Sequence, residues 1–482
     1  MKELLKNEAN ITYTENGAVT YLSSNSALVD LFSTIGALRV ANEQEIIDRF
    51  EMAFAEDRTI AMKILFFARD IRGGLGERRV FDIILKHIAN KYPESVEKNV
   101  NLIAEFGRFD DLLQLLRSPC ERQALEVIET TLKADKATET PSLLAKWLPS
   151  INTSNKDAVA NGCYIAKKLG LSNVEYRKLL VALRAKIRII ENNLREKNYT
   201  FDYAKQPSKA MFKYKKAFLR NDLDRYTDFM RKVESGEAKL NVGTLYPYDI
   251  VRNCMAEKVS KAEKGVLDTT WKRLKESIQV DDNALAVIDG SGSMYDEGRL
   301  SPIEIAISLG ILFGECNKGD FKNSFITFSE KPQLVEIRGE DIFQKVQNVM
   351  AYNDCSNTNI QKVFELILKT AVKHKLPQSE LPSALYIISD MEFDEGVDNG
   401  KLTNFENAKA KFEAKGYKLP KIIFWNVQSR TRQNPVQYNE QGVCLVSGAS
   451  PKLFERVVDN NVNPLQFMLD IVNSERYSKI VG

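Results

Sequence analysis

A short apolar run, residues 284–288, ends on Asp289, and two hydroxyls follow at alternate positions, Ser291 and Ser293. A buried strand that delivers a carboxylate to its carboxyl end is the usual place for a ligand site in an α/β sheet. One carboxylate and two serines offer only hard oxygen ligands, which suit a Mg²⁺-type cation. The glycines between them let the loop turn tightly enough for both hydroxyls to face one point. The segment predicts a divalent-cation site; the alternative is a Gly/Ser turn without metal.

This Asp-x-Ser-x-Ser pattern resembles the metal-ion-dependent adhesion site of von Willebrand factor A domains. In that family a distant Thr and a distant Asp complete the site, and Thr358 and Asp390 are the candidates in this chain. The resemblance implies that Ser291, Ser293 and Thr358 bind Mg²⁺ or another divalent cation directly. It also implies that Asp289 and Asp390 act mainly through water, and that a protein partner offers a carboxylate to the metal.

Further carboxylates follow Asp390 at the same strand end. Glu392 and Asp394 come two and four residues later. Crowded like charges need a counter-cation, which a bound Mg²⁺ could supply. The alternative is that these two side chains point to solvent in a loop.

Catalysis is not expected at this strand end. Phosphotransferases that use an Asp nucleophile beside Mg²⁺ need a second Asp two residues on, where this chain has Ser291. No general base is evident, and only two histidines are present. The sequence therefore favours a protein that is not an enzyme and has no small-molecule substrate.

Length and composition favour a multidomain cytoplasmic protein. A chain of 482 residues predicts two or more domains. No apolar run approaches membrane-spanning length and the first residues carry no signal region, so no membrane association is expected. The six cysteines are scattered without a CxxC pair, which argues against zinc and disulfides and favours a reducing compartment.

The hydrophobic period changes near residue 281. Before it, apolar residues recur at helical spacing, and the capping box at Ser172 precedes a long helix expected from Tyr176 to about Lys197. After it, short apolar strands alternate with helices, the rhythm of a parallel sheet. The expected strands are 284–289, 323–328, 384–389, 421–427 and 442–446, with helices at 302–316, 360–374 and 404–416.

The predicted fold class is α + α/β. Successive helices with short loops indicate a helical-repeat, HEAT-like domain, and the second half indicates a doubly wound α/β domain of the von Willebrand factor A type. The expected divisions are an N-terminal extension at 1–26, the helical repeats at 27–280, the A-like domain at 281–450, and C-terminal helices at 451–482 that pack back.

Positive charge is concentrated in the helical half. Residues 1–280 carry 46 Lys and Arg against 38 Asp and Glu, whereas the remainder carries 22 against 27. The basic half is therefore the first place to look for a polyanion, while the acidic half fits a cation-binding domain.

Four arginines fall within eleven residues around a Gly-rich loop: Arg69, Arg72, Arg78 and Arg79. A helix is expected to end before this loop and another to start with Glu77 in its first turn. The arginines either form ion pairs on a solvated loop or bind phosphates, for which guanidinium groups are well suited. The loop is not a nucleotide-binding phosphate loop, because no Gly-Lys-Ser/Thr follows.

A second basic segment, residues 177–220, holds 13 Lys and Arg against three acidic residues. Basic residues neutralise a nucleic-acid backbone, and interleaved aromatics can stack on unpaired bases. The alternative is that the aromatics are core and the lysines a solvated face. The aromatics are Tyr199, Phe201, Tyr203, Phe212, Tyr214 and Phe218, and the candidate RNA contacts are Arg184, Lys186, Arg188, Lys209, Lys213, Lys215 and Lys216.

Several motifs together resemble the Ro/TROVE group: Phe-x-Ala-Arg-Asp-x-Arg-Gly-Gly-x-Gly-Glu-Arg at 66–78, Lys-Trp-Leu-Pro-Ser at 146–150, and the C-terminal A-type domain. The motifs at 389–393 and 446–451 are closer still to the Ro-like (DUF2828-type) family of uncharacterised proteins in plants, phages and large viruses. The resemblance implies a ring of helical repeats that binds structured or misfolded RNA, with the A domain closing the ring.

Two functions remain open at this point. The first is a non-catalytic RNA-binding scaffold in which the metal site docks a protein partner. The second is a metal-dependent protein–protein adaptor that binds no RNA. Charge separates them, because phosphate contacts by six or more Lys and Arg would make affinity fall steeply with salt.

Overall fold

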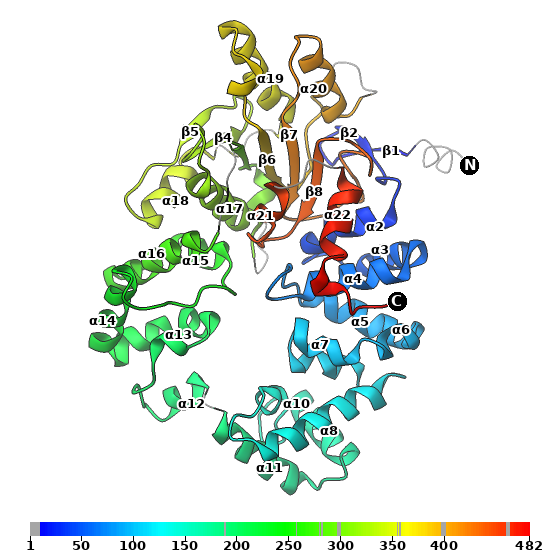
Figure 1. Ribbon diagram of the computed structural model, residues 1–482, viewed down its shortest axis with the longest axis vertical. Coiled ribbons are helices and arrows are strands. Elements are labelled where there is room, and N and C mark those ends of the chain that lie inside the picture. Colours follow the sequence, from blue (N-terminus) through cyan, green and yellow to red (C-terminus); the bar gives the residue numbers. More distant parts are fainter. Residues whose placement is uncertain are drawn as a thin grey trace.

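The computed structural model describes residues 10–187, 189–256, 258–278, 280, 283–295, 300–353, 355, 358–396, 402–458 and 463–482. Helices from α2 (Ala27–Thr34) to α16 (Lys261–Glu276) trace an arc, and both ends of the arc meet a six-stranded sheet (Figure 1). The elements thus form a ring that the sheet domain closes. The predicted α + α/β fold class is confirmed.

The arc runs down one side of the ring and returns on the other (Figure 1). Side chains of Asn42, Asp57, Asn155 and Ser172 each accept a first-turn N–H and so start a helix where the sequence changes from polar to apolar-periodic. Its elements after α2 are η1 (Ile35–Ala37), α3 (Glu43–Glu56), α4 (Arg58–Arg69), α5 (Arg79–Lys91), α6 (Pro93–Glu97), α7 (Val100–Phe106), η2 (Phe109–Leu115), α8 (Glu121–Ala137), α9 (Leu144–Trp147), α10 (Lys156–Lys168), α11 (Asn173–Lys186), α12 (Ile190–Arg195), η3 (Tyr203–Lys205), α13 (Ser208–Asn221), α14 (Leu223–Glu234) and α15 (Pro247–Cys254).

Two expected helix boundaries are wrong. The single helix expected from residue 176 to about 197 is two helices, α11 and α12. The Asn192 side-chain amide donates to the carbonyls of Arg184 and Ile187, which satisfies the end of α11 and turns the chain. Glu77 precedes α5 rather than lying in its first turn, and its carboxylate pairs with Arg39.

The sheet has the strand order β5–β4–β3–β6–β7–β8, with only β5 antiparallel. All five residues of β3 are buried, as expected for a central parallel strand covered on both faces. The strands are β3 (Leu285–Asp289), β4 (Ser324–Phe328), β5 (Leu334–Glu336), β6 (Ala384–Ser389), β7 (Lys421–Asn426) and β8 (Val443–Ser447).

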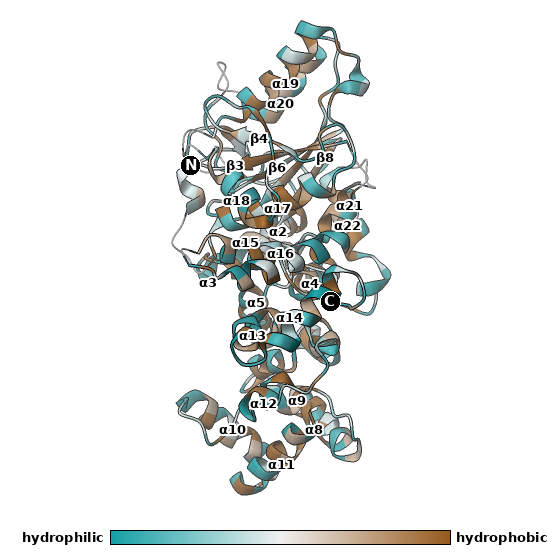
Figure 2. Ribbon diagram, turned by 90° about the vertical axis from the view of Figure 1, so that its left-hand side faces the viewer, coloured by the Kyte–Doolittle hydropathy of each residue, from teal (hydrophilic) through white to brown (hydrophobic). Residues whose placement is uncertain are grey.

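Helices cover the two faces of the sheet unequally. The face toward the ring packs on α17 (Pro302–Cys316), on α2 and on α22 (Pro464–Val472), whereas α19 (Ile360–His374) and α20 (Asn404–Glu413) lie on the other side (Figures 1 and 2). Shorter elements complete the domain: η4 (Gly292–Tyr295), α18 (Ile342–Met350), η5 (Gln378–Glu380), α21 (Leu453–Val458) and η6 (Glu475–Tyr477).

Both ends of the arc are tied to the sheet domain by close contacts. At one end, the Gly36 N–H donates to the Ser447 hydroxyl at 3.0 Å, and a Cβ on Gly36 would lie 2.8 Å from the Ser447 backbone. At the other, α15 packs on α17, and Arg252 forms an ion pair with Glu304 at 2.5 Å. The ring is therefore closed by packing and not by chain connectivity alone.

Residues before α2 form a β-hairpin that belongs spatially to the sheet domain. Strands β1 (Ile11–Tyr13) and β2 (Val19–Tyr21) pair antiparallel, and Tyr21 exchanges backbone hydrogen bonds with Asn434. The segment that the sequence presents as an N-terminal extension thus contacts a loop more than 400 residues away.

Candidate metal site

The carboxyl ends of β3 and β6 form the candidate site. These strands are parallel neighbours in register, Ile288 opposite Ile388, so Asp289 and the residues that follow Ile388 emerge side by side. The chain passes from β3 outward to β4 and from β6 outward to β7, so the order reverses between them. Such a switch point is where open α/β sheets bind ligands.

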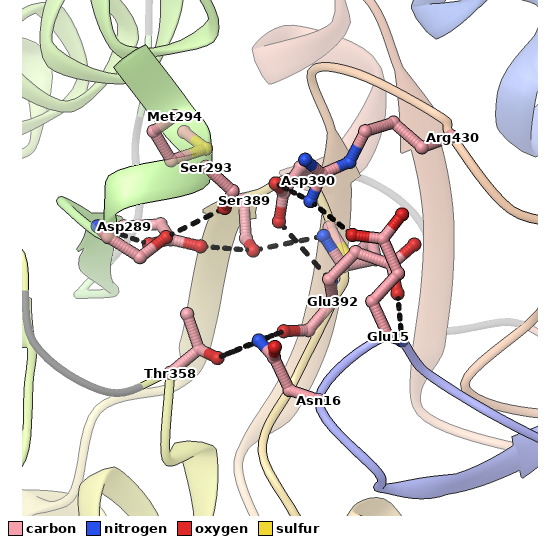
Figure 3. A network of polar contacts seen from close by, with 12 residues as sticks. Glu15, Asn16, Asp289, Ser293, Met294, Thr358, Ser389, Asp390, Glu392 and Arg430 are labelled. Atoms are coloured by element: carbon pink, nitrogen blue, oxygen red, sulfur yellow. Dashed lines mark hydrogen bonds and ion pairs between the residues drawn. The ribbon is translucent and has the colours of Figure 1, made fainter. Parts of the chain in front are cut away.

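Asp289 is fully buried and its carboxylate is held in place by two hydrogen bonds (Figure 3). The Ser291 N–H donates to Oδ1 at 2.9 Å, and the Ser389 hydroxyl donates to Oδ2 at 2.5 Å. The hydroxyls of Ser291 and Ser293 lie 3.1 Å apart. The Gly-rich loop therefore gathers one carboxylate and two hydroxyls at the strand end.

Thr358, just before α19, is also buried beside this strand end. Its hydroxyl oxygen lies 2.9 Å from the Glu392 carbonyl and 2.9 Å from Oδ1 of Asp394. The side-chain amide of Asn16, from the hairpin turn, donates to the same hydroxyl at 3.1 Å. Thr358 thus connects three segments that are far apart in the sequence.

Electrostatics at the site favour a cation. Burial, followed by the negative charge of Asp390, raises the pKa of Asp289 to about 7. Asp390 is itself buried, and Arg430 forms an ion pair with it at 2.9 Å. Arg430 offsets part of the negative charge. The remaining donors are carboxylate and hydroxyl oxygens, so the residues present fit a hard divalent cation.

The two further carboxylates do not both point to solvent. Glu392 is buried, accepts from the Glu15 N–H at 2.7 Å and from the Thr431 hydroxyl at 2.6 Å, and burial raises its pKa. Asp394 is half-buried against Thr358. Within the described residues no group of three or more His, Cys, Asp or Glu side chains could hold a metal. A cation here would depend on Ser, Thr and water oxygens together with the two aspartates.

Four residues of the site were not predicted from the sequence: Ser389, Arg430, Glu15 and Asn16. Ser389 could have been found, because it is the last residue of the strand pattern that introduces Asp390. The other three come from segments that only the tertiary fold brings together.

The Gly-rich loop in the helical half is built into a junction. Arg69 is buried and pairs with Asp111 at 2.8 Å, so its guanidinium is not at the surface. Arg78 is half-buried and pairs with Asp110 at 2.7 Å. Arg72 and Arg79 are exposed, although both donate to backbone carbonyls. The loop brings two of its four arginines to solvent.

The same loop joins the two arms of the ring. The Tyr246 hydroxyl, at the start of α15, donates to the Leu75 carbonyl at 2.9 Å. Gly76 has φ +69°, and a Cβ there would lie 1.9 Å from that hydroxyl. Asp70 pairs with Arg476, close to the C-terminal helices. The glycines of this loop thus serve close packing between distant parts of the chain.

In the second basic segment, three of the named side chains are engaged inside the protein. Arg184 donates to the carbonyls of Ala145 and Leu148 and to the Ser150 hydroxyl. Lys186 is half-buried and donates to the Thr138 carbonyl. Lys215 is buried near Glu263, and burial lowers its pKa. The exposed members are Lys209, Lys213 and Lys216, while Arg188 lies outside the described residues.

The interleaved aromatics pack against one another. Tyr203 and Phe218 are buried, with ring centroids 5.3 Å apart, and Phe201 contacts both. Tyr199, Phe212 and Tyr214 are half-buried. Most of these ring faces therefore form the core of the return arm, as the alternative interpretation of the sequence has it.

Comparisons with known proteins assign both halves of the chain. A family described as "Domain of unknown function (DUF2828)" matches residues 14–141 and 165–283. A second, described as "Domain of unknown function (DUF7788)", matches residues 283–472. "Uncharacterized protein L728" of Acanthamoeba polyphaga mimivirus is 29% identical over 509 residues, covering 96% of this chain and 87% of that protein.

The fold is similar to the crystal structure of Deinococcus radiodurans Ro (RSR) protein. The TM-score is 0.52, with 90% of this chain and all of that chain covered. Sequence identity is 14%, so this likeness concerns the fold. No helix among the described residues is both long enough and apolar enough to cross a membrane.

Proposed function

This chain belongs to the family described as Domain of unknown function (DUF2828), and we propose that it is a non-catalytic, Ro-like RNA-binding scaffold. Its helical ring would hold RNA by basic side chains, and its A-like domain would bind a protein partner through a divalent cation. The Ro-like fold and the net positive charge of the helical half support the first role. The oxygen donors at the ends of β3 and β6 support the second.

The observation that carries the RNA proposal is the exposed basic surface of α13 and the turn before it. Lys213, Lys216 and Arg220 are exposed on a helix whose other side is packed in the return arm. Lys205 and Lys209 precede them and are exposed as well. Lys205, Lys209 and Lys216 also lie near carboxylates of the protein, those of Asp202, Asp249 and Glu263. With Lys213 and Arg220 they would offer up to five phosphate contacts, which would give a steep dependence of affinity on salt.

The experiment is RNA binding by a triple charge reversal, Lys213→Glu, Lys216→Glu and Arg220→Glu. RNA that co-purifies with the full chain would be sequenced and used as the probe at several salt concentrations. We expect the slope of log Kd against log salt concentration to decrease by about two. Each phosphate contact that is lost lowers this slope by about 0.7 to 0.9.

A matched control reverses the charge of three exposed lysines of the A-like domain by changing Lys373, Lys415 and Lys418 to Glu. The change in net charge is the same, so a non-specific charge effect would appear in both variants. An identical salt dependence in wild type and in the α13 variant would remove this surface from the RNA site.

For the metal, Ser291, Ser293 and Thr358 would be the direct ligands, with Asp289 and Asp390 acting through water. A bound divalent cation would supply a positive centre whose shell a partner's carboxylate completes. Ser389 would orient Asp289, and Arg430 would hold Asp390.

A protein–protein adaptor without RNA binding remains the second candidate. The observation in its favour is that five of the eleven predicted RNA contacts are buried or half-buried and are also bonded to the protein itself: Arg69, Arg78, Arg184, Lys186 and Lys215. Partner binding that resists nuclease but is lost on chelation of divalent cations, with no RNA bound at low salt, would favour the adaptor.

A further inference from the structure

The turn of the N-terminal hairpin lies directly against the candidate metal site (Figure 3). The Asn16 side-chain amide donates to the hydroxyl of Thr358 at 3.1 Å and to the carbonyl of Glu392 at 2.7 Å. In return, the Asn16 carbonyl accepts from the Glu395 N–H at 3.2 Å. Asn16 therefore contacts a proposed metal ligand, Thr358, and is hydrogen-bonded to two residues of the loop that follows β6.

Glu15 presents a carboxylate at the same place. Its N–H donates to the Glu392 carboxylate at 2.7 Å, and its own carboxylate pairs with Arg430 at 3.0 Å. The same Arg430 nitrogen lies 2.9 Å from Asp390. Arg430 thus bridges a carboxylate of the site and a carboxylate of the turn. The Glu15 side chain is 44% exposed, so it lies at the rim and not in the core.

We propose that the β1–β2 turn is an intramolecular occupant of the candidate metal site, with Glu15 standing where the carboxylate of a partner would otherwise bind. The inference rests on the metal-dependent part of the proposed function. It also defines the partner: a protein turn that carries an acidic side chain, able to replace Glu15 at Arg430 and to reach the cation from there.

The way the hairpin is anchored makes such an exchange physically reasonable. Its base is held by two backbone hydrogen bonds between Tyr21 and Asn434, whereas its tip is held by one backbone hydrogen bond, from the Glu395 N–H to the Asn16 carbonyl, and otherwise by side-chain contacts. The tip can therefore be released without loss of the base. A tethered ligand acts at a high effective concentration, so only a partner with comparable chemistry competes with it.

The test uses Mn²⁺ as the probe on the full-length protein. A double variant, Glu15→Gln with Asn16→Ala, removes the ion pair of Glu15 with Arg430 and both hydrogen bonds that the Asn16 amide donates. The Thr14 hydroxyl still donates to the Phe393 carbonyl at 2.5 Å. We expect bound Mn²⁺ in this variant to enhance water-proton relaxation about twofold more than in wild type, because an uncovered cation keeps more exchangeable waters. Hydrogen exchange of the amides of residues 14–17 should rise about tenfold, while the amide of Tyr21 stays protected.

Two further variants make every outcome decisive. Glu380→Gln with Asn439→Ala alters two exposed side chains outside the turn and should behave as wild type. Asp289→Ala tests the metal site itself. Mn²⁺ binding that depends on Asp289, with equal relaxation and exchange in wild type and in the turn variant, would overturn the occupant while leaving the metal site intact. Mn²⁺ binding only in the turn variant would support the proposal, because the β1–β2 turn would then block the metal site completely in the wild type. No Mn²⁺ binding in any variant would refute the metal site and the occupant together.

Discussion

The strand-end site in the sheet domain and the Gly-rich arginine loop in the helical half present similar groups in opposite settings. At the strand end, Asp289 and Asp390 are buried and Arg430 pairs with Asp390 from the surface, and burial with mutual repulsion raises the pKa of Asp289 to about 7. In the loop, Arg69 is buried against Asp111. Removing one partner of a buried ion pair leaves an uncompensated charge and destabilises the fold, whereas two buried carboxyl groups side by side raise each other's pKa and favour a nearby cation.

This difference explains why the positions of the two aspartates could be predicted from the sequence, whereas the role of the arginines could not. The two aspartates are placed by strand ends, and a parallel register fixes where strand ends meet. The arginines sit on helices and turns, where a long side chain can reach inward or outward. Their charge alone therefore does not predict a binding role.

The largest expected effect is on stability when the buried pair in the loop is broken. Arg69→Ala removes the 2.8 Å ion pair of buried Asp111 and leaves it the longer contact with Arg78 at 3.4 Å, and we expect the free energy of unfolding to fall by about 3 kcal/mol. Urea denaturation followed by circular dichroism measures it. The matched change Arg72→Ala, at an exposed arginine of the same loop, should cost about 0.5 kcal/mol or less. Equal losses in both variants would contradict the division into structural and exposed arginines.

The second prediction addresses the strand end. Ser389→Ala removes the hydroxyl that donates to Asp289 at 2.5 Å. We expect Mn²⁺ affinity to fall about tenfold or more, as for other residues that orient metal ligands through hydrogen bonds. Calorimetric titration of wild type, of Ser389→Ala and of the exposed control Ser379→Ala measures the effect. Unchanged affinity in Ser389→Ala would mean that Asp289 needs no such support, or that it holds no cation.

The third and smallest effect is a pH dependence in the loop region. Burial, followed by the charge of Asp111, raises the pKa of Asp82 to about 6. The ordinary value is near 3.9, so the folded state binds more protons between about pH 4 and 6, and stability falls as pH rises through that window. We expect the stability of Asp82→Asn relative to wild type to improve by about 1 to 2 kcal/mol from pH 4 to pH 7. A constant difference across that range would show that Asp82 ionises normally.

Much of the sheet domain could be predicted from sequence. The strands ending at Asp289 and Ser389 lie where the apolar runs place them, because buried parallel strands are continuous runs with sharp polar ends. Strand β5, with the exposed Leu334 in a three-residue element, gives no such signal. Helix α11 ends earlier than its periodicity indicates, because a side-chain hydrogen bond from Asn192 caps it.

The candidate site was predictable only in part, because some of its residues belong to a local sequence pattern and others do not. Asp289, Ser291 and Ser293 stand at alternate positions in one recognisable short pattern. Asn16 and Arg430 enter through tertiary contacts that span hundreds of residues, and no local pattern records such contacts. Sequence thus indicates the chemistry of the strand end but not what covers it.

Closure of the ring also determines the order in which the protein can fold. The Gly36 backbone packs on Ser447, and the rings of Phe67 and Phe106 pack on Tyr477. During translation the first helices therefore emerge several hundred residues before the surfaces that complete their core. Contacts of such long sequence separation form slowly and leave apolar surface exposed meanwhile. The family boundary at residue 283 is accordingly not a place where the chain can be divided into two self-sufficient folding units.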